Sequence, residues 1–404
     1  MNPLASLGII LVFALLAGHL VKFVRVPEVT GYILAGVAVG PSFLGWISHD
    51  NLASLEVFSE VALGLILFSI GSVFEISKFR EIGRRAVLIT FVESMLAGVI
   101  VSLGMFFAGQ PWTVSILLGA ISMETAAAST LMVMRECNSS GPLTEILTGV
   151  ITLNNICCLI CFSLAATAID LSLRSNSNTT LGQSLQISIF PLVWQLVGSV
   201  ALGFLIGLIF SLWSSRVKEQ GETLILMAGG VLLCVGLAEW LDLSPLIASL
   251  AVGATLANLS AKSRRLFDAL SRTDPPLYAI FFVIAGADLN LALLPTLGVL
   301  GAIYVAGRAA GKFVGTRFAA RIGGLRLDIQ RLIGLAMLSQ AGLAIGLVLV
   351  TNERFPQIGP TISTIVLASV AIFELVGPLG ARFALEKSGE VRPHDAHATV
   401  TLDP

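Results

Sequence analysis

Four ionisable residues lie near the middle of long apolar segments of the sequence. They are Glu93, Glu124, Arg308 and Glu374. An ionisable side chain at that depth of a membrane is costly unless it is paired or hydrated, so each is a candidate for binding or moving an ion. A carboxylate there can take up a proton or a monovalent cation, whereas an arginine needs a carboxylate partner or an anionic ligand.

Glu124 is the strongest of these candidates because of the residues around it. The sequence Ser-Met-Glu-Thr-Ala-Ala-Ala-Ser-Thr covers residues 122–130. Such small and hydroxyl-bearing residues are unlike a lipid-facing helix and indicate a broken helix that lines a cavity, where oxygen atoms help to hold a cation. We therefore predict that Glu124 and Thr125 bind an ion. The alternative is that Glu124 only neutralises a buried arginine.

Two adjacent amides, Asn154 and Asn155, lie at the middle of another apolar segment. Their side-chain oxygens can bind a cation, but an amide cannot exchange a proton. Hydrogen bonding between helices is the alternative role. The three cysteines within 157–161 are expected to pack as small apolar residues. The only metal expected is Na+ or K+, at Glu124, Asn154 and Asn155.

Further candidates come from the second half of the chain and from an earlier apolar segment. Arg308 is a permanent cation among glycines and alanines, and Lys312, one turn nearer the cytoplasm, is expected to extend towards the membrane surface. The sequence Ser-Gln-Ala-Gly at 339–342, which contains the candidate Gln340, predicts a second helix break. Two broken helices that cross at the midplane present opposed dipoles, which a charged side chain offsets. Lys312, Glu374 and Glu93 are secondary candidates.

The elements that must position these residues follow from the composition. The chain has 404 residues, of which 55% are hydrophobic and only 12% are charged, about half the share in a soluble domain. Its long apolar runs do not alternate, which predicts membrane-spanning helices rather than barrel strands. We expect an all-α integral membrane protein with about thirteen transmembrane helices. Their expected limits are 3–21, 27–46, 54–73, 86–108, 112–134, 143–169, 190–213, 221–240, 243–260, 276–293, 295–317, 331–350 and 360–382.

The basic residues predict how these spans are oriented. With the N-terminus outside, only Arg174 and Arg354 of the 24 Lys and Arg residues fall in outer loops, and only Arg308 and Lys312 fall within a span. Since basic loops stay on the cytoplasmic side, we expect a multi-pass protein of the inner (plasma) membrane with a cytoplasmic C-terminus. No phosphate-binding or dinucleotide-binding motif and no basic tract appears, so we expect neither an enzyme, nor a cofactor, nor a nucleic-acid partner.

An internal repeat relates the two halves of the chain. Pro-Glu-Val-Thr-Gly-Tyr-Ile-Leu-Ala-Gly, ending at Gly36, is echoed by Pro-Leu-Ile-Ala-Ser-Leu-Ala-Val-Gly, ending at Gly253. Gly71 follows the first copy by 35 residues and Gly286 follows the second by 33, and the two expected helix breaks come 53 and 54 residues later. The copies are offset by seven spans, an odd number, so they are inverted. Inverted repeats are typical of secondary transporters.

Several short sequences together resemble the monovalent cation:proton antiporter family, in the Kef-like branch of the sodium/proton exchanger superfamily. The resemblance covers roughly residues 5–390. The sequences that carry it lie at 26–32, 36–42, 68–71, 129–136, 141–144, 281–282, 339–342 and 373–375. They are specific for the family but not for a substrate.

The resemblance implies a thirteen-helix antiporter fold with two crossing broken helices, elevator-type alternating access and a homodimer. The implied parts are a dimerisation domain at 1–80 and 221–293, a mobile core at 86–170 and 295–385, a linker helix at 190–213 and a cytoplasmic tail at 386–404. The implied partners are the transported ion, the proton, membrane lipid and a second copy of the chain.

The chain departs from this family at one decisive place. The family carries Asp-Asp or Asn-Asp where this chain has Asn154-Asn155, and the second aspartate carries the proton and the cation. We favour a Na+ or K+/proton antiporter in which Glu124 has taken that role, with Asn154, Asn155 and Thr125 as neutral ligands and Arg308 competing for the empty carboxylate. One alternative is a fixed Glu124–Arg308 pair in a transporter of another solute or anion. The other is a non-transporting membrane sensor or scaffold.

Overall fold

A computed structural model describes most of the chain as helices. It covers residues 3–24, 26–71, 76–174, 181–214, 219–260, 274–289 and 298–391, together with 216, 263, 266–267 and 291. Over these residues the structure contains no strand, as expected for an all-α protein. Seven helices within them are long and apolar enough to cross a membrane, by length and composition, and shorter apolar helices lie between them.

The helices follow the predicted spans closely. In chain order they are α1 (Pro3–Phe23), α2 (Glu28–Val39), α3 (His49–Gly71), α4 (Ile76–Phe107), α5 (Trp112–Ser122), α6 (Ala127–Glu136), α7 (Pro142–Arg174), α8 (Leu181–Ser214), α9 (Gln220–Trp240), α10 (Pro245–Leu259), α12 (Asp274–Asp288), α13 (Gly298–Ile322), α14 (Leu327–Leu332), the 3-10 turn η3 (Leu335–Met337), α15 (Gly342–Arg354) and α16 (Gly359–Ser388). The helix expected at 190–213 is longer than predicted, because α8 begins at Leu181.

The repeated glycines lie where helices from the two halves of the chain cross. A Cβ added at Gly36 would overlap the main chain of α12 around Gly286, and one added at Gly71 would overlap that of α10 around Gly253. Each copy of the repeat therefore packs against the opposite member of the other copy, α2 on α12 and α3 on α10. This reciprocal pairing is what an inverted repeat requires. It agrees with the repeat predicted from sequence.

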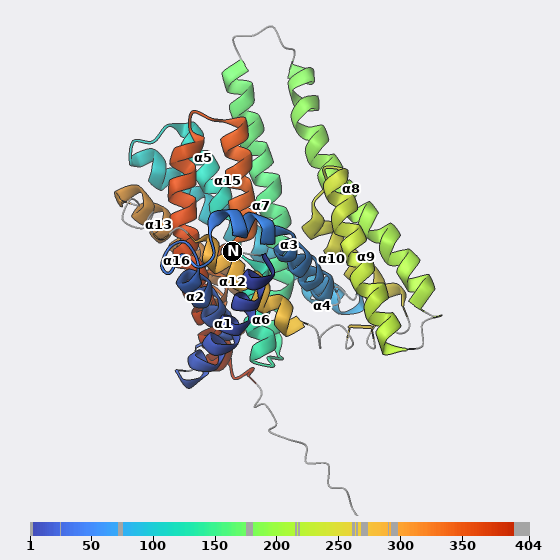
Figure 1. Cartoon of the computed structure of the whole chain (residues 1–404). Coiled ribbons are helices and arrows are strands. Elements are labelled where there is room, and N and C mark those ends of the chain that lie inside the picture. The colour runs from blue at the N-terminus through green and yellow to red at the C-terminus, as the bar shows by residue number, and fades with distance from the viewer. Residues whose placement is uncertain are drawn as a thin grey trace, which may run out of the picture.

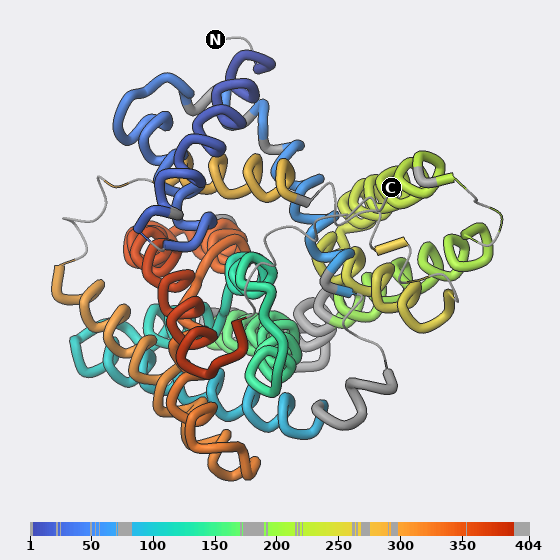
Figure 2. The backbone as a smooth tube through the Cα atoms, turned by 90° about the horizontal axis from the view of Figure 1, so that it is seen from below, coloured from blue at the N-terminus to red at the C-terminus, as the bar shows by residue number. Residues whose placement is uncertain are grey.

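A separate group of helices lies at one side of the molecule. Figure 1 shows α8, α9 and α10 together at the right, and the same group stands apart in the view from below (Figure 2). Together with α3 these helices share an apolar cluster that includes Phe68, Phe210 and Val231. The outer face of α8 exposes large apolar side chains such as Phe204 and Leu212. Exposed apolar side chains along a span-length helix are suited to lipid.

The other main group of helices contains the two breaks predicted from sequence. Helix α13 lies along α4 at the edge of the molecule in Figure 2. The expected span 112–134 is divided into α5 and α6 by residues 123–126, and the expected span 331–350 is interrupted between η3 and α15 by residues 338–341. The amide N–H of Ala126 donates to the carbonyl oxygen of Ser339 at 3.0 Å, so the two unwound segments meet. Both breaks are confirmed.

The start of the predicted tail is anchored to α7. The carboxylate of Glu390 accepts from the main-chain N–H groups of Leu143 (2.7 Å) and Thr144 (2.8 Å) and from the Thr144 hydroxyl. These N–H groups lie in the first turn of α7, which has no helical acceptors for them. The segment following α16 therefore caps the helix that carries Asn154 and Asn155. The remainder of the predicted tail, 392–404, lies outside the described residues.

Candidate ion site at the helix crossing

Arg308 binds the main chain of both unwound segments. Its Nη1 donates to the carbonyl oxygen of Leu338 at 2.7 Å, and its Nη2 donates to those of Glu124 (2.6 Å) and Ser339 (3.0 Å). The guanidinium also stacks over the ring of Phe373, with 4.2 Å from Cζ to the centroid. Carbonyl groups at a helix break lack helical donors and carry the negative end of the dipole. The Arg308 side chain therefore offsets the negative helix-end charge of the main chain at the crossing. Its hydrogen bond to Glu124 goes to the main-chain carbonyl oxygen and not to the carboxylate.

A buried ion pair lies beside this crossing. The Nζ of Lys312 is 2.9 Å from Oε2 of Glu93, and both side chains are 0% exposed. The other carboxylate oxygen of Glu93 accepts from Nδ2 of Asn154 at 2.6 Å and from the Ser94 hydroxyl at 3.0 Å. Lys312 also donates to the Thr125 hydroxyl (2.7 Å), on the first broken helix. The pair thus connects α4, α7, α13 and the break between α5 and α6.

Close packing of α13 on α4 places these charges together. A Cβ added at Gly311 would overlap the main chain of Ala97, and one added at Gly315 would lie 2.6 Å from the Cα of Glu93. Small residues spaced four apart allow helices in a membrane to approach closely. Lys312 lies between these two glycines, and its side chain therefore reaches Glu93 and the break without leaving the protein interior.

The structure corrects one expectation, about Lys312, and shows where Glu93 lies. Lys312 was expected to extend towards the membrane surface, and this is wrong, because its side chain is fully buried and paired. Glu93 was a secondary candidate, but it lies against both Lys312 and Asn154. The pairing joins residues 219 positions apart and has no local sequence signal. The glycine spacing on α13, at 307, 311 and 315, is the one feature that could have indicated a tight partner helix.

Glu124 and Glu374 lie on another side of the crossing. The Glu124 carboxylate is buried and accepts from the amide N–H of Ala341 at 3.3 Å, in the second break. Glu374 is also buried, and both of its oxygens accept from the Ser129 hydroxyl at 3.2 Å. Ala341 and Glu374 line a cavity of about 410 Å³ between α3, α12, α15 and α16. Glu60 on α3 and Asp288 on α12 line the same cavity, so its carboxylates come from three helices.

The amides predicted to bind an ion have unused oxygens. Oδ1 of Asn154 and Oδ1 of Asn155 are buried without a hydrogen-bond partner among the described residues. Nδ2 of Asn154 faces three oxygens, those of Glu93, Ser94 and the Met123 carbonyl, which fixes the orientation of the amide. Buried polar atoms are normally satisfied. These two orphaned oxygens are therefore suited to a cation.

The side chain of Gln340 connects the second helix break to three neighbouring helices. Its Nε2 lies 2.9 Å from the Tyr304 hydroxyl and 3.3 Å from the carbonyl oxygen of Ile121, and its Oε1 accepts from Ser369 at 3.4 Å. These contacts connect the second break to α13, α5 and α16. Among the predicted residues, Glu93, Asn154 and Thr125 lie around Lys312. Glu124 lies at the crossing with Arg308, Glu374 lines the cavity, and Gln340 has a network of its own. Asn155 follows Asn154 on α7, and its Oδ1 has no hydrogen-bond partner among the described residues.

The chain is similar to antiporters along nearly its whole length. The ammonium/H(+) antiporter subunit AmhT of Alkalihalophilus pseudofirmus is 24% identical over 91% of this chain and 91% of its own length. The Na(+)/H(+) antiporter NhaS5 of a Synechocystis species is 25% identical over 95% of this chain, which spans about half (51%) of that relative. Both relatives are transporters rather than enzymes.

Solved structures show the same fold. Two structures of the sodium proton antiporter MjNhaP1 from Methanocaldococcus jannaschii match 96% of this chain, with TM-scores of 0.67 and 0.72 at 17% and 19% identity. The family model described as "Sodium/hydrogen exchanger, transmembrane" matches residues 8–387. The family to which the resemblance pointed is thus confirmed, while its Kef-like branch stays a prediction. The chain is a multi-pass integral membrane protein that belongs to the sodium/hydrogen exchanger family.

Proposed function

We propose that the chain exchanges a monovalent cation, Na+ or K+, for a proton across the membrane. Family membership and the antiport named for two relatives support this function. The observation that carries it is the balance of buried charge at the crossing. Three carboxylates lie there, those of Glu93, Glu124 and Glu374, with two cations, Lys312 and Arg308.

One more positive charge would neutralise the three buried carboxylates, because only two buried cations lie beside them. Lys312 is matched by Glu93 at 2.9 Å. The guanidinium of Arg308 is therefore the one remaining buried cation near two carboxylates, Glu124 and Glu374. With all five groups ionised the crossing has one excess negative charge, and an uncompensated charge is strongly disfavoured inside a membrane. One proton or one monovalent cation removes the excess, so the two compete for the same place.

Glu124 is the exchanging carboxylate in this proposal. It lies on the broken helix itself, and its only described side-chain hydrogen bond is the one at 3.3 Å from Ala341, which lines the cavity. Glu93, in contrast, is engaged at both oxygens. Asn154, Asn155 and Thr125 supply neutral oxygens, and the carboxylate of Glu374 lines the cavity.

Alternating access follows from the division of the fold. The core, 86–170 and 295–385, moves as an elevator against the dimerisation domain, 1–80 and 221–293, with 190–213 as the linker. In support, the cavity is lined by α3 and α12, which belong to the proposed dimerisation domain, and by α15 and α16, which belong to the proposed core. The protein works as a homodimer in the inner membrane, with its N-terminus outside and its C-terminus in the cytoplasm. Transport of an anion on Arg308 has less support, because its guanidinium already binds three carbonyl oxygens.

Proteoliposomes that contain a pH-sensitive dye test the function. With the wild type, Na+ or K+ added outside is expected to enter in exchange for lumenal protons and so to raise lumenal pH. Glu124→Gln is expected to abolish this signal. Glu239→Gln, at the exposed end of α9, is the matched control and is expected to keep the signal. Asn155→Asp is expected to increase the exchange. If the wild type gives no signal with either ion, or Glu124→Gln behaves like the wild type, the proposal is wrong.

A further inference from the structure

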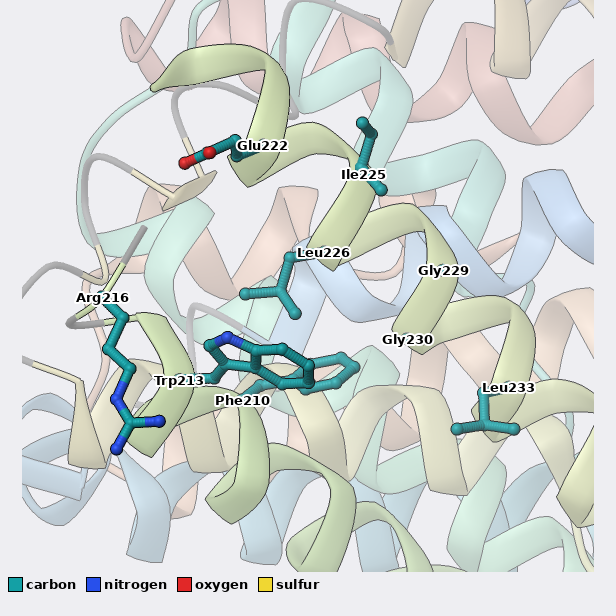
Figure 3. Close-up of a pocket in the computed structure, with 9 residues that line it drawn as sticks. All are labelled: Phe210, Trp213, Arg216, Glu222, Ile225, Leu226, Gly229, Gly230 and Leu233. Carbon is teal, nitrogen blue, oxygen red and sulfur yellow. The ribbon is translucent and has the colours of Figure 1, made fainter. Parts of the chain in front are cut away.

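We infer that a groove at one end of α8 and α9 binds a phospholipid whose headgroup carries both a phosphate and a primary ammonium. The groove has a volume of about 500 Å³ and lies away from the ion site. Its floor and walls come from the last turns of α8 and the first half of α9, as Figure 3 shows. It is independent of the proposed ion exchange, because no residue of the crossing lines it.

The groove is a trough open to the lipid. The ring of Phe210 occupies the space where a side chain at Gly230 would lie, whereas a Cβ added at Gly229 would meet nothing within 4 Å. Two adjacent glycines therefore remove one face of α9 and leave a depression. Trp213 and Leu233, both 55% exposed, lie on its border. An apolar depression on the surface of a span-length helix accommodates an acyl chain.

One end of the trough is charged and lies at a membrane surface. Arg216 lies in the connection between two helices that are long enough to cross the membrane, Val193–Ser214 and Gly221–Trp240. In Figure 3, Arg216 and Glu222 are both at the end of the groove opposite Leu233. Trp213 lies next to this end, where amphipathic rings are favoured at the boundary between lipid and water. The groove is therefore charged at one end and apolar along the rest, as a phospholipid molecule is.

The pair of charges specifies the headgroup. A guanidinium binds phosphate oxygens through two parallel N–H donors, and the carboxylate of Glu222 can accept hydrogen bonds from an ammonium. A phospholipid of the ethanolamine type presents both groups, joined by two carbons. Phosphatidylcholine has the phosphate but no N–H donor, and phosphatidylglycerol has no cation. The groove is therefore expected to bind phosphatidylethanolamine more tightly than phosphatidylcholine or phosphatidylglycerol.

Native mass spectrometry of the full-length protein in detergent measures this order directly. The probes are dioleoyl phosphatidylethanolamine, phosphatidylcholine and phosphatidylglycerol, added in a titration. One charged contact near the membrane surface changes affinity about fivefold. Wild type is expected to bind the ethanolamine lipid about fivefold more tightly than the choline lipid. Glu222→Gln is expected to remove that preference, and Arg216→Gln to weaken both lipids about fivefold, while the control Arg321→Gln changes neither.

A pair of glycine variants tests the place of the acyl chain. Gly229→Leu fills the trough and is expected to abolish binding, whereas Gly236→Leu, on an exposed and open part of the same helix, is expected to leave it intact. Equal binding by Gly229→Leu and wild type, or tightest binding of phosphatidylglycerol with no effect of Glu222→Gln, would overturn the inference. So would a dimeric wild type that binds no lipid and becomes monomeric with Gly229→Leu, because the groove would then be filled by a second copy.

Discussion

Replacing Asn154 by aspartate puts two carboxylates in direct contact. Nδ2 of Asn154 is 2.6 Å from Oε1 of Glu93, and aspartate has the same shape with an acceptor in place of that donor. Two unit charges at that separation repel by about 6 kcal/mol at an effective dielectric constant of about 20, and by about 4 kcal/mol when the side chains move to 4 Å. We expect Asn154→Asp to lower the free energy of unfolding by about 4 kcal/mol.

A second substitution restores the balance without changing the shape of either side chain. In Glu93→Gln/Asn154→Asp the one negative charge moves from α4 to α7. The new amide at 93 donates to the new carboxylate, and Lys312 stays close to it, because Lys312 and Asn154 donate to the same carbonyl oxygen of Met123. We expect the double variant to regain most of the lost stability, to within about 1–2 kcal/mol of wild type.

Unfolding in mixed micelles with increasing SDS, followed by tryptophan fluorescence, measures both variants. Asn155→Asp is the matched control, because it adds the same charge one residue away, where no hydrogen bond to a carboxylate is found among the described residues. A smaller loss of stability is expected for it. An Asn154→Asp protein within about 1 kcal/mol of wild type would rule out the expected repulsion between the two carboxylates. A double variant no more stable than Asn154→Asp also refutes it.

Three further substitutions test the other contacts. Lys312→Met leaves Glu93 buried without its partner and should destabilise the protein by about 3–5 kcal/mol in the same SDS unfolding, with part of the loss recovered by adding Glu93→Leu. Arg308→Lys should lower stability by about 2 kcal/mol in thermal unfolding, because one ammonium cannot reproduce a planar fork that binds three carbonyls; stability equal to wild type would contradict that role. Gly36→Ala should cost about 1–3 kcal/mol through overlap with α12, whereas Gly8→Ala, with nothing within 4 Å, should change nothing.

The breaks in the two helices were predictable because their signal is local. A cluster of small and hydroxyl-bearing residues around Glu124, and the Ser-Gln-Ala-Gly sequence at Gln340, weaken a helix wherever they occur. The inverted repeat was predictable for a similar reason, since glycines at matching spacing report close crossings. Both features are written in short stretches of sequence and need no knowledge of how distant helices pack.

The pairing of Lys312 with Glu93 was not predictable in this way. The span was expected to end at residue 317, whereas α13 continues to Ile322. The contact itself depends on how closely α13 approaches α4, through Gly311 and Gly315. Periodicity and local composition describe one helix at a time, so a charge pair between two helices lies outside what they report.

Asn154 on α7 and Glu93 on α4 depend on each other. The amide of Asn154 donates to the carboxylate of Glu93 on α4. The same carboxylate is paired with Lys312. An acid at 154 would repel Glu93, so an amide on α7 and a carboxylate on α4 require each other. The crossing therefore keeps a negative charge beside its lysine, supplied by another helix. Because that charge is held at both oxygens, we assign the proposed exchange to Glu124, whose carboxylate has one described hydrogen bond.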